Sequence, residues 1–109
     1  MELAFAKKFL RELCENEARA QQDLGTNVAK KLKRRVADLR ASPCVKDLVA
    51  GRPHELSGNR NRHVALELCE GYCIVISNNH AHVPMLDSGG TDWSRVSRVK
   101  IVEIVASRD

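Results

Sequence analysis

The sequence predicts an α+β fold in which an N-terminal helical hairpin packs on a small, mostly antiparallel sheet. Apolar residues recur at helical spacing in the first part of the chain and alternate with polar residues, as in strands, after His54. The stretch Gly51-Arg52-Pro53 separates the two patterns. Helices followed by strands are the order of elements expected for an α+β domain.

The chain length and composition favour one small globular domain. The 109 residues are assigned to a single domain, residues 1–109, with room for one modest core. Hydrophobic residues make up 43% and charged residues 29%, which is typical of a soluble globular protein. Aromatic residues make up only 4%, so the core must be built from Val, Leu, Ile and Ala. The net charge of +4 favours a polyanionic partner.

The cysteines and the N-terminal residues indicate a cytoplasmic, reduced protein. Two lysines interrupt the first apolar residues, so we expect no signal peptide, and no segment is long enough to span a membrane. The four cysteines are expected to serve as small core residues. Cys69-x3-Cys73 lies near His80-x-His82, but this is not a usual zinc spacing. We therefore expect no metal and no other cofactor.

The first helix is expected to start near Ala6. The preceding residues, Glu2–Phe5, are apolar enough for a short strand or for a first helical turn. From Ala6 the apolar positions form a helical stripe, which predicts a helix that fades near Ala20. Gly25 is a plausible residue to end it.

The second helix is the clearest element of the sequence. Thr26 or Asn27 can cap its start, and Ser42-Pro43 ends it because the residue before a proline avoids helical geometry. Its apolar positions recur at helical spacing, and basic residues crowd its other faces. These basic residues either form a solvated face or bind the backbone of an RNA. They are Lys30, Lys31, Lys33, Arg34 and Arg35.

The remaining elements are expected to form the sheet. The run Tyr72–Ser77 is nearly all apolar and therefore belongs near the centre of the sheet. The other expected elements are a helical turn within Val45–Ala50, a strand at His63–Cys69, a hairpin turn at Glu70-Gly71, a loop over Asn78–Thr91 and a last strand over Val96–Val105.

The stretch Pro53–His63 is the best candidate for a site. It places two histidines and two arginines around a short Gly-Asn turn. The arginine side chain suits a phosphate, and histidine is the side chain that most easily moves a proton near neutral pH. Together they suggest binding of, or chemistry on, a phosphodiester. The alternative interpretation is a basic, solvated hairpin loop.

The segment His54-Glu55-Leu56-Ser57-Gly58-Asn59-Arg60 resembles a family signature. It is similar to the His-x-Leu-x-Gly-Asn/Asp-Arg pattern of bacterial toxins of the RelE/ParE superfamily, HigB branch. Four further segments resemble family features in the same order, so the resemblance covers essentially the whole chain. These segments are the basic helix Lys30–Leu39, Asp47-Leu48, Tyr72 at the start of the middle strand and Asp87–Trp93.

The resemblance implies a RelE-like fold and the toxin of a type II toxin–antitoxin system. Such toxins cut mRNA, commonly on the ribosome in the bacterial cytoplasm, and a helix-turn-helix antitoxin silences them. Cleavage needs no metal, because the 2′-hydroxyl of the RNA attacks the adjacent phosphate. By this resemblance His54 is the candidate base or acid, and Arg60 and Arg62 hold the phosphate. The basic helix residues would bind the RNA backbone, so we expect a cleft between this helix and the sheet.

The sequence departs from the family at three catalytic positions. Cys73 stands where members usually carry an arginine, and Ser57 stands where many carry a lysine. The chain ends in Ala106-Ser107-Arg108 in place of Asp-Tyr-His or a similar end. Arg108 is a candidate to replace part of the lost charge, but arginine cannot act as a general base near pH 7. The alternative is therefore a degenerate member that binds RNA and antitoxin without cleaving, or one that acts on another target.

Overall fold

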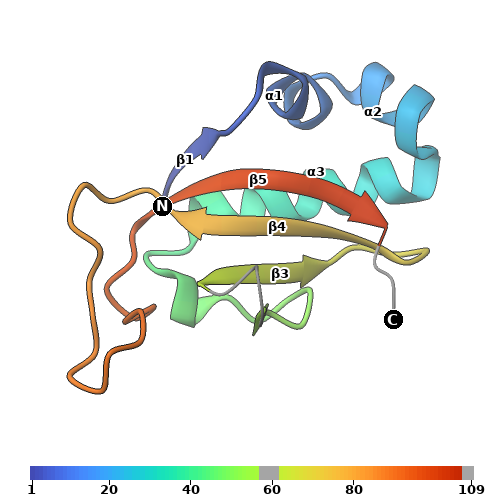
Figure 1. Ribbon diagram of the computed structural model, residues 1–109. Coiled ribbons are helices and arrows are strands. Elements are labelled where there is room, and N and C mark those ends of the chain that lie inside the picture. The colour runs from blue at the N-terminus through green and yellow to red at the C-terminus, as the bar shows by residue number, and fades with distance from the viewer. Residues whose placement is uncertain (57–61, 107–109) are drawn as a thin grey trace.

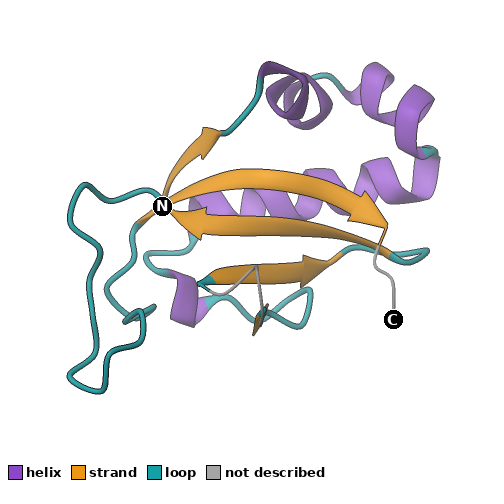
Figure 2. Cartoon of the chain, in the orientation of Figure 1, coloured by secondary structure: helices purple, strands orange, loops and turns teal. Residues whose placement is uncertain are grey.

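The computed structural model describes residues 1–56 and 62–106. Its helices form one layer and its strands form the other (Figures 1 and 2). None of the described helices combines the length and apolar character needed to cross a bilayer. In chain order the elements are β1 (Glu2–Phe5), α1 (Lys8–Glu15), α2 (Glu17–Leu24), α3 (Thr26–Ala41), the 3₁₀ turn η1 (Val45–Asp47), β2 (His54–Glu55), β3 (His63–Glu67), β4 (Tyr72–Asn78) and β5 (Arg98–Ala106).

The sheet has five strands in the order β1-β5-β4-β3-β2. Only the edge pair of β1 and β5 is parallel among these neighbours, and the other three pairs are antiparallel. The apolar strand β4 lies in the centre, as its sequence predicts. Glu70 and Gly71 both have positive φ, 52° and 80°, and form the predicted turn between β3 and β4. The α+β fold predicted from the sequence is therefore confirmed.

The helices cover one face of the sheet. The apolar stripe of α3 is buried in the same core cluster as alternate residues of the strands, such as Val64, Leu66, Ile74 and Ile76. Figure 1 shows α3 running behind β4 and β5. The residues between them in sequence, including Ala65 and Val75, point to the other face, which no described helix covers. We call this the helix-free face.

The prediction of one helix before Gly25 is wrong, because the chain forms α1 and α2 with a break at Asn16. The Asn16 backbone is extended, with φ of −119° and ψ of 102°, and its side-chain oxygen accepts a hydrogen bond from the Arg19 N–H at 3.1 Å. Asparagine favours such caps because its short side chain bonds nearby backbone groups. The predicted cap of the next helix is also wrong, since Gly25 takes that position without a side-chain bond.

The first strand and the long loop complete the sheet layer. Of the two alternatives for Glu2–Phe5, the structure has the strand, paired with β5. The loop between β4 and β5 runs from residue 79 to residue 97, beyond the predicted range. Its fold is held in part by His80, whose Nε2 accepts hydrogen bonds from the backbone N–H groups of Ser97 and Arg98 at 3.0 and 3.3 Å. The loop is therefore anchored at the start of β5.

Candidate functional site

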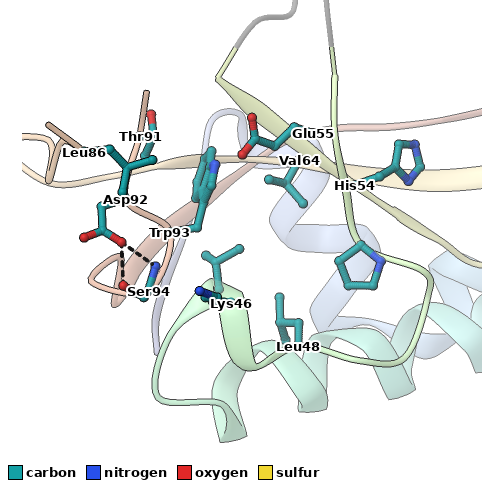
Figure 3. Close-up of a pocket in the computed structure, with 12 residues that line it drawn as sticks. Lys46, Leu48, His54, Glu55, Val64, Leu86, Thr91, Asp92, Trp93 and Ser94 are labelled. Carbon is teal, nitrogen blue, oxygen red and sulfur yellow. Dashed lines mark hydrogen bonds between the residues drawn. The ribbon is translucent and has the colours of Figure 1, made fainter. Parts of the chain in front are cut away.

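Two hollows meet at the edge strand β2. The first lies on the helix-free face, is also lined by Leu24 at the end of α2, and has a cavity volume of about 1320 Å³. The second lies on the helix side, between β2, η1 and the loop 79–97, and has a volume of about 370 Å³ (Figure 3). Pro53 and His54 line both. We call the first the sheet cleft and the second the Trp93 pocket.

The imidazole of His54 is oriented by the backbone next to it. Its Nδ1 lies 2.9 Å from the carbonyl oxygen of Arg52. A carbonyl can only accept a hydrogen bond, so Nδ1 carries the proton and donates it. In the neutral ring Nε2 then keeps its lone pair and can accept a proton. His54 is exposed and pairs with Ala65, which places its side chain on the helix-free face beside the cleft.

The strand register defines the floor of the sheet cleft. His54 pairs with Ala65, Ala65 pairs with Val75, and Val75 pairs with Glu103, so these four residues form one row across the sheet. Three strand spacings separate the ends of the row, or about 14 Å. The floor is therefore apolar in the middle and has a carboxylate at its far end.

A second row contributes charge and a thiol to the same floor. Glu67 and Cys73 are paired and both line the cleft. Arg52 is 88% exposed, lines the cleft beside His54 and forms an ion pair with Glu67 at 3.4 Å. The site residues predicted from the sequence did not include Arg52, Glu67 and Glu103. Arg52 directly precedes the predicted Pro53–His63 stretch, whereas the placement of the two glutamates depends on the strand register.

His63 lies near His54 on the same face. It is two residues from Ala65 along β3, so it is a diagonal neighbour of His54. Such neighbours have Cα atoms about 7–8 Å apart. The Nδ1 atom of His63 is buried and has no hydrogen-bond partner in the part of the chain that the structure describes. Two imidazoles thus share one region of the helix-free face.

The structure describes two of the four predicted catalytic residues. His54 lines both hollows, whereas Arg62 is exposed just before β3, has φ of 75° and lines neither hollow. Arg60 and Arg108 lie outside the described residues, as does Ser57.

The expected cleft between the basic helix and the sheet is wrong. The apolar stripe of α3 is buried against the sheet, so the space between them is filled by the core. The basic residues of α3 belong to the helix layer, and the sheet separates that layer from the cleft beside His54. Lys30, Lys33 and Arg34 are exposed, and Lys31 is half-buried.

Arg35 has partners that give it a structural role. Its side chain is only 13% exposed and forms an ion pair with Asp38 at 3.2 Å. Its Nε donates a hydrogen bond to the backbone oxygen of Glu67 at 3.3 Å. Lys33 is paired with Glu17 at 3.4 Å on the surface. Among the five predicted RNA-binding residues, Arg35 therefore has the contacts that contribute most to the fold.

The Trp93 pocket combines apolar walls with unpaired polar atoms. Trp93 is 9% exposed and Thr91 is 6% exposed. The indole Nε1 and the threonine Oγ1 are buried without a hydrogen-bond partner among the described residues. Figure 3 shows the indole between the Thr91–Asp92 segment and the side chains of Glu55 and Val64. Lys46 also lines the pocket, so both signs of charge are present.

The described residues gather no metal site, and burial shields one thiol that lies outside the cleft. Across residues 1–56 and 62–106, no three histidine, cysteine or acidic side chains gather to hold a metal ion. Burial raises the pKa of Cys14 to about 12, against an ordinary value of 9.0, so this thiol stays protonated at neutral pH.

Comparison with known proteins supports the fold. No protein-family model matches the chain, and no curated protein sequence is similar enough to count as a match. The chain is similar in structure to the YoeB/ParE toxin from Agrobacterium tumefaciens, with a TM-score of 0.62 and 9% identity over 99% of this chain and 100% of that one. It is also similar to a chain of the YoeB–YefM complex from Staphylococcus aureus, with a TM-score of 0.58 and 10% identity over 95% and 93%. At such low identity, the likeness shows the fold alone.

Proposed function

We propose that this protein is the toxin of a type II toxin–antitoxin system and cleaves mRNA as a HigB-like member of the RelE/ParE superfamily. The observation that carries this proposal is the exposed His54 at the sheet cleft, whose Nδ1–H is held by the Arg52 carbonyl at 2.9 Å. The similarity of the fold to YoeB/ParE toxins over the whole chain supports it. The His54–Arg60 signature supplies the link to this branch.

In the proposed reaction His54 Nε2 removes the proton from a ribose 2′-hydroxyl. The 2′-oxygen attacks the adjacent phosphorus, and the bond to the 5′-oxygen of the next nucleotide breaks. A general acid protonates that leaving oxygen, which yields a 2′,3′-cyclic phosphate and a 5′-hydroxyl. We propose His63 as the acid, because it is a diagonal neighbour of His54 on the same face. Arg60, Arg62 and Arg108 are the candidates to hold the charged phosphate.

The proposal includes partners and a place of action. A helix-turn-helix antitoxin would silence the protein, and the substrate would be mRNA on the ribosome in the bacterial cytoplasm. One structurally similar chain comes from a YoeB–YefM complex, which supports a protein partner. The exposed cations Lys30 and Arg34 would bind the RNA backbone.

A catalytically degenerate toxin is the second candidate. The specific observation in its favour is the cleft floor, where Glu67, Cys73 and Glu103 lie. Glu67 is paired with Arg52, but Glu103 adds a further carboxylate that repels a phosphate, and the exposed cations Lys30 and Arg34 belong to the helix layer. Such a protein would bind RNA or its antitoxin without cutting.

The test is induction in bacteria without the neighbouring gene, with mapping of mRNA ends. The proposal expects growth arrest and new mRNA ends that carry a 5′-hydroxyl. His54→Ala should lower the cleavage rate about a hundredfold or more, the contribution typical of a general base. His82→Ala is the matched control, because His82 is an exposed histidine outside both hollows.

The two candidates differ in outcome. Arrest without new ends would contradict the nuclease and favour the degenerate toxin. Cleavage that survives His54→Ala would contradict the role of His54 as the general base. His63→Gln tests the acid separately. If His63 protonates the leaving oxygen, this variant should lose the alkaline limb of the pH–rate profile while wild-type binding is retained.

A further inference from the structure

The Trp93 pocket contains groups that its own chain leaves unsatisfied. Trp93 Nε1 can only donate a hydrogen bond, and Thr91 Oγ1 can donate or accept. Both atoms are buried without partners within the described chain, on side chains that are more than nine-tenths buried. Buried polar groups in proteins are nearly always paired, so two orphans lining one pocket indicate a ligand that pairs with them.

The pocket walls define the chemistry of that ligand. Val45, Leu48 and Val64 provide apolar contact surface. Glu55 adds a carboxylate that can only accept a hydrogen bond, and Lys46 adds a cation. The ligand therefore needs apolar faces, an edge with both acceptors and donors, and an anionic group nearby. A volume of about 370 Å³ is at the small end of ligand pockets.

We propose that the Trp93 pocket binds a nucleobase, either of a free nucleotide or of an RNA strand. The flat faces of a base fit the apolar walls. An acceptor on the base edge would pair with Trp93 Nε1, and an amino group would donate to Glu55. Lys46 would contact the phosphate. The two buried atoms must become accessible for this pairing, and we propose that Leu86, which lines the pocket and is 46% exposed, is the side chain that shifts.

The position of the pocket links it to the sheet cleft, and this part rests on the proposed function. Pro53 and His54 line both hollows, so a strand cleaved at His54 passes the mouth of the Trp93 pocket. The base next to the scissile phosphate would enter the pocket over the edge of β2. The pocket would then select the base at which the RNA is cut.

The experiment uses the fluorescence of Trp93, the single tryptophan of the sequence. The full-length protein is titrated with the four nucleoside 5′-monophosphates, with inorganic phosphate and with a short 2′-O-methyl RNA. This RNA lacks the attacking hydroxyl and cannot be cleaved. We expect a saturable change with at least one base, none with phosphate alone, and tighter binding of the RNA that carries this base. Response to mononucleotides without preference for the RNA would assign the pocket to a free nucleotide.

Two variants test whether the signal comes from this pocket. Glu55→Ala and Thr91→Val each remove a hydrogen-bonding group and should each weaken binding about tenfold, as expected when one good hydrogen bond is lost. Glu70→Ala is the matched control, because Glu70 is an exposed glutamate in the β3–β4 turn. No change with any nucleotide, an equal change with phosphate, or unaltered binding by both variants would overturn the proposal.

The outcome separates this inference from the nuclease proposal. Base binding to the uncleavable RNA without any mRNA cleavage would leave the pocket standing and reject the nuclease. mRNA cleavage that depends on His54, without base binding, would support the nuclease and reject the role of the Trp93 pocket.

Discussion

Asp92 holds the turn next to Trp93 through its side chain. Its Oδ1 accepts hydrogen bonds from the Ser94 hydroxyl and backbone N–H, and its Oδ2 lies 2.8 Å from Arg95 Nε. The hydrogen bond from Ser94, followed by that from Arg95, lowers the pKa of this carboxyl below its ordinary value of 3.8. The charged form is therefore the one that the folded loop stabilises.

A pH titration should show this dependence. Because the pKa is lower in the folded state, the stabilisation is present above about pH 3.8 and is lost as the pH falls through the lowered value. We expect Trp93 emission to stay constant down to pH 4 and to shift to longer wavelength below it. Asp92→Asn should show the shifted emission already at neutral pH. Asp87→Asn, an exposed residue of the same loop, should behave like the wild type.

The candidate site was only partly predictable at the level of residues. His54 was identifiable because its residue type and its place in a basic turn indicate proton transfer. The bond from its Nδ1 to Arg52, and the placement of His63 and Glu103 on the same face, depend on strand register. A shift of one residue in that register would turn every side chain to the other face. The sequence alone does not determine this register.

Among the helices, the break at Asn16 offers a direct test of capping. Asn16→Ala removes the side-chain bond to the Arg19 N–H and should lower the free energy of unfolding by about 1 kcal/mol in urea denaturation. Asn27→Ala is the control, because Asn27 is exposed inside α3 and caps nothing. It should leave stability within about 0.5 kcal/mol. Equal losses in the two variants would argue against a capping role for Asn16.

Gly51 joins η1 to β2 and shows how the site strand is held in place. Its φ is 87°, and an added Cβ would lie 2.9 Å from Arg35 Nε and 3.0 Å from the Glu67 oxygen. Gly25 has nearly the same φ of 88° but no atom within 4 Å of such a Cβ. Comparing alanine substitutions at Gly25 and Gly51 therefore distinguishes the cost of a positive φ from the cost of steric crowding.

We expect Gly25→Ala to cost about 1–3 kcal/mol from the backbone conformation alone, because φ of 88° with ψ of 161° is essentially restricted to glycine. Gly51→Ala should cost about 1–3 kcal/mol more, because Arg35 and the end of β3 must move. Chemical denaturation measures both. Equal losses of unfolding free energy would mean that Arg35 and its neighbours shift at little cost to make room for the added methyl group. The packing between α3 and the segment that leads into β2 would then contribute little to stability.

The elements themselves differ in how well the sequence predicted them. α3 and β4 were clear because long runs follow one period, and a buried strand is nearly all apolar. β2 has only two residues, which is too short for any period to show. The break at Asn16 was missed because the helical stripe continues across it, and the cap depends on a local bond that competes with the helix.

At the scale of the whole molecule, the sheet separates two surfaces with different proposed roles, one in RNA binding and one in cleavage. The helix layer carries the exposed cations Lys30 and Arg34, and the helix-free face carries His54. RNA affinity and cleavage should therefore respond to different substitutions. A large RNA, such as mRNA on a ribosome, can contact both surfaces.

Salt dependence of RNA binding tests this division. Each phosphate contact with a single strand contributes about 0.7 to the slope of log K against log salt. The double variant Lys30→Ala/Arg34→Ala should lower that slope by about 1.4 when binding of 2′-O-methyl RNA is measured at several salt concentrations. His54→Ala should leave the slope unchanged. The control Lys7→Ala/Lys8→Ala removes the same charge from exposed residues near α1 and should alter the slope little. An equal drop of the slope in the control would show that net charge governs RNA binding. It would contradict the proposal that the α3 surface binds the RNA backbone.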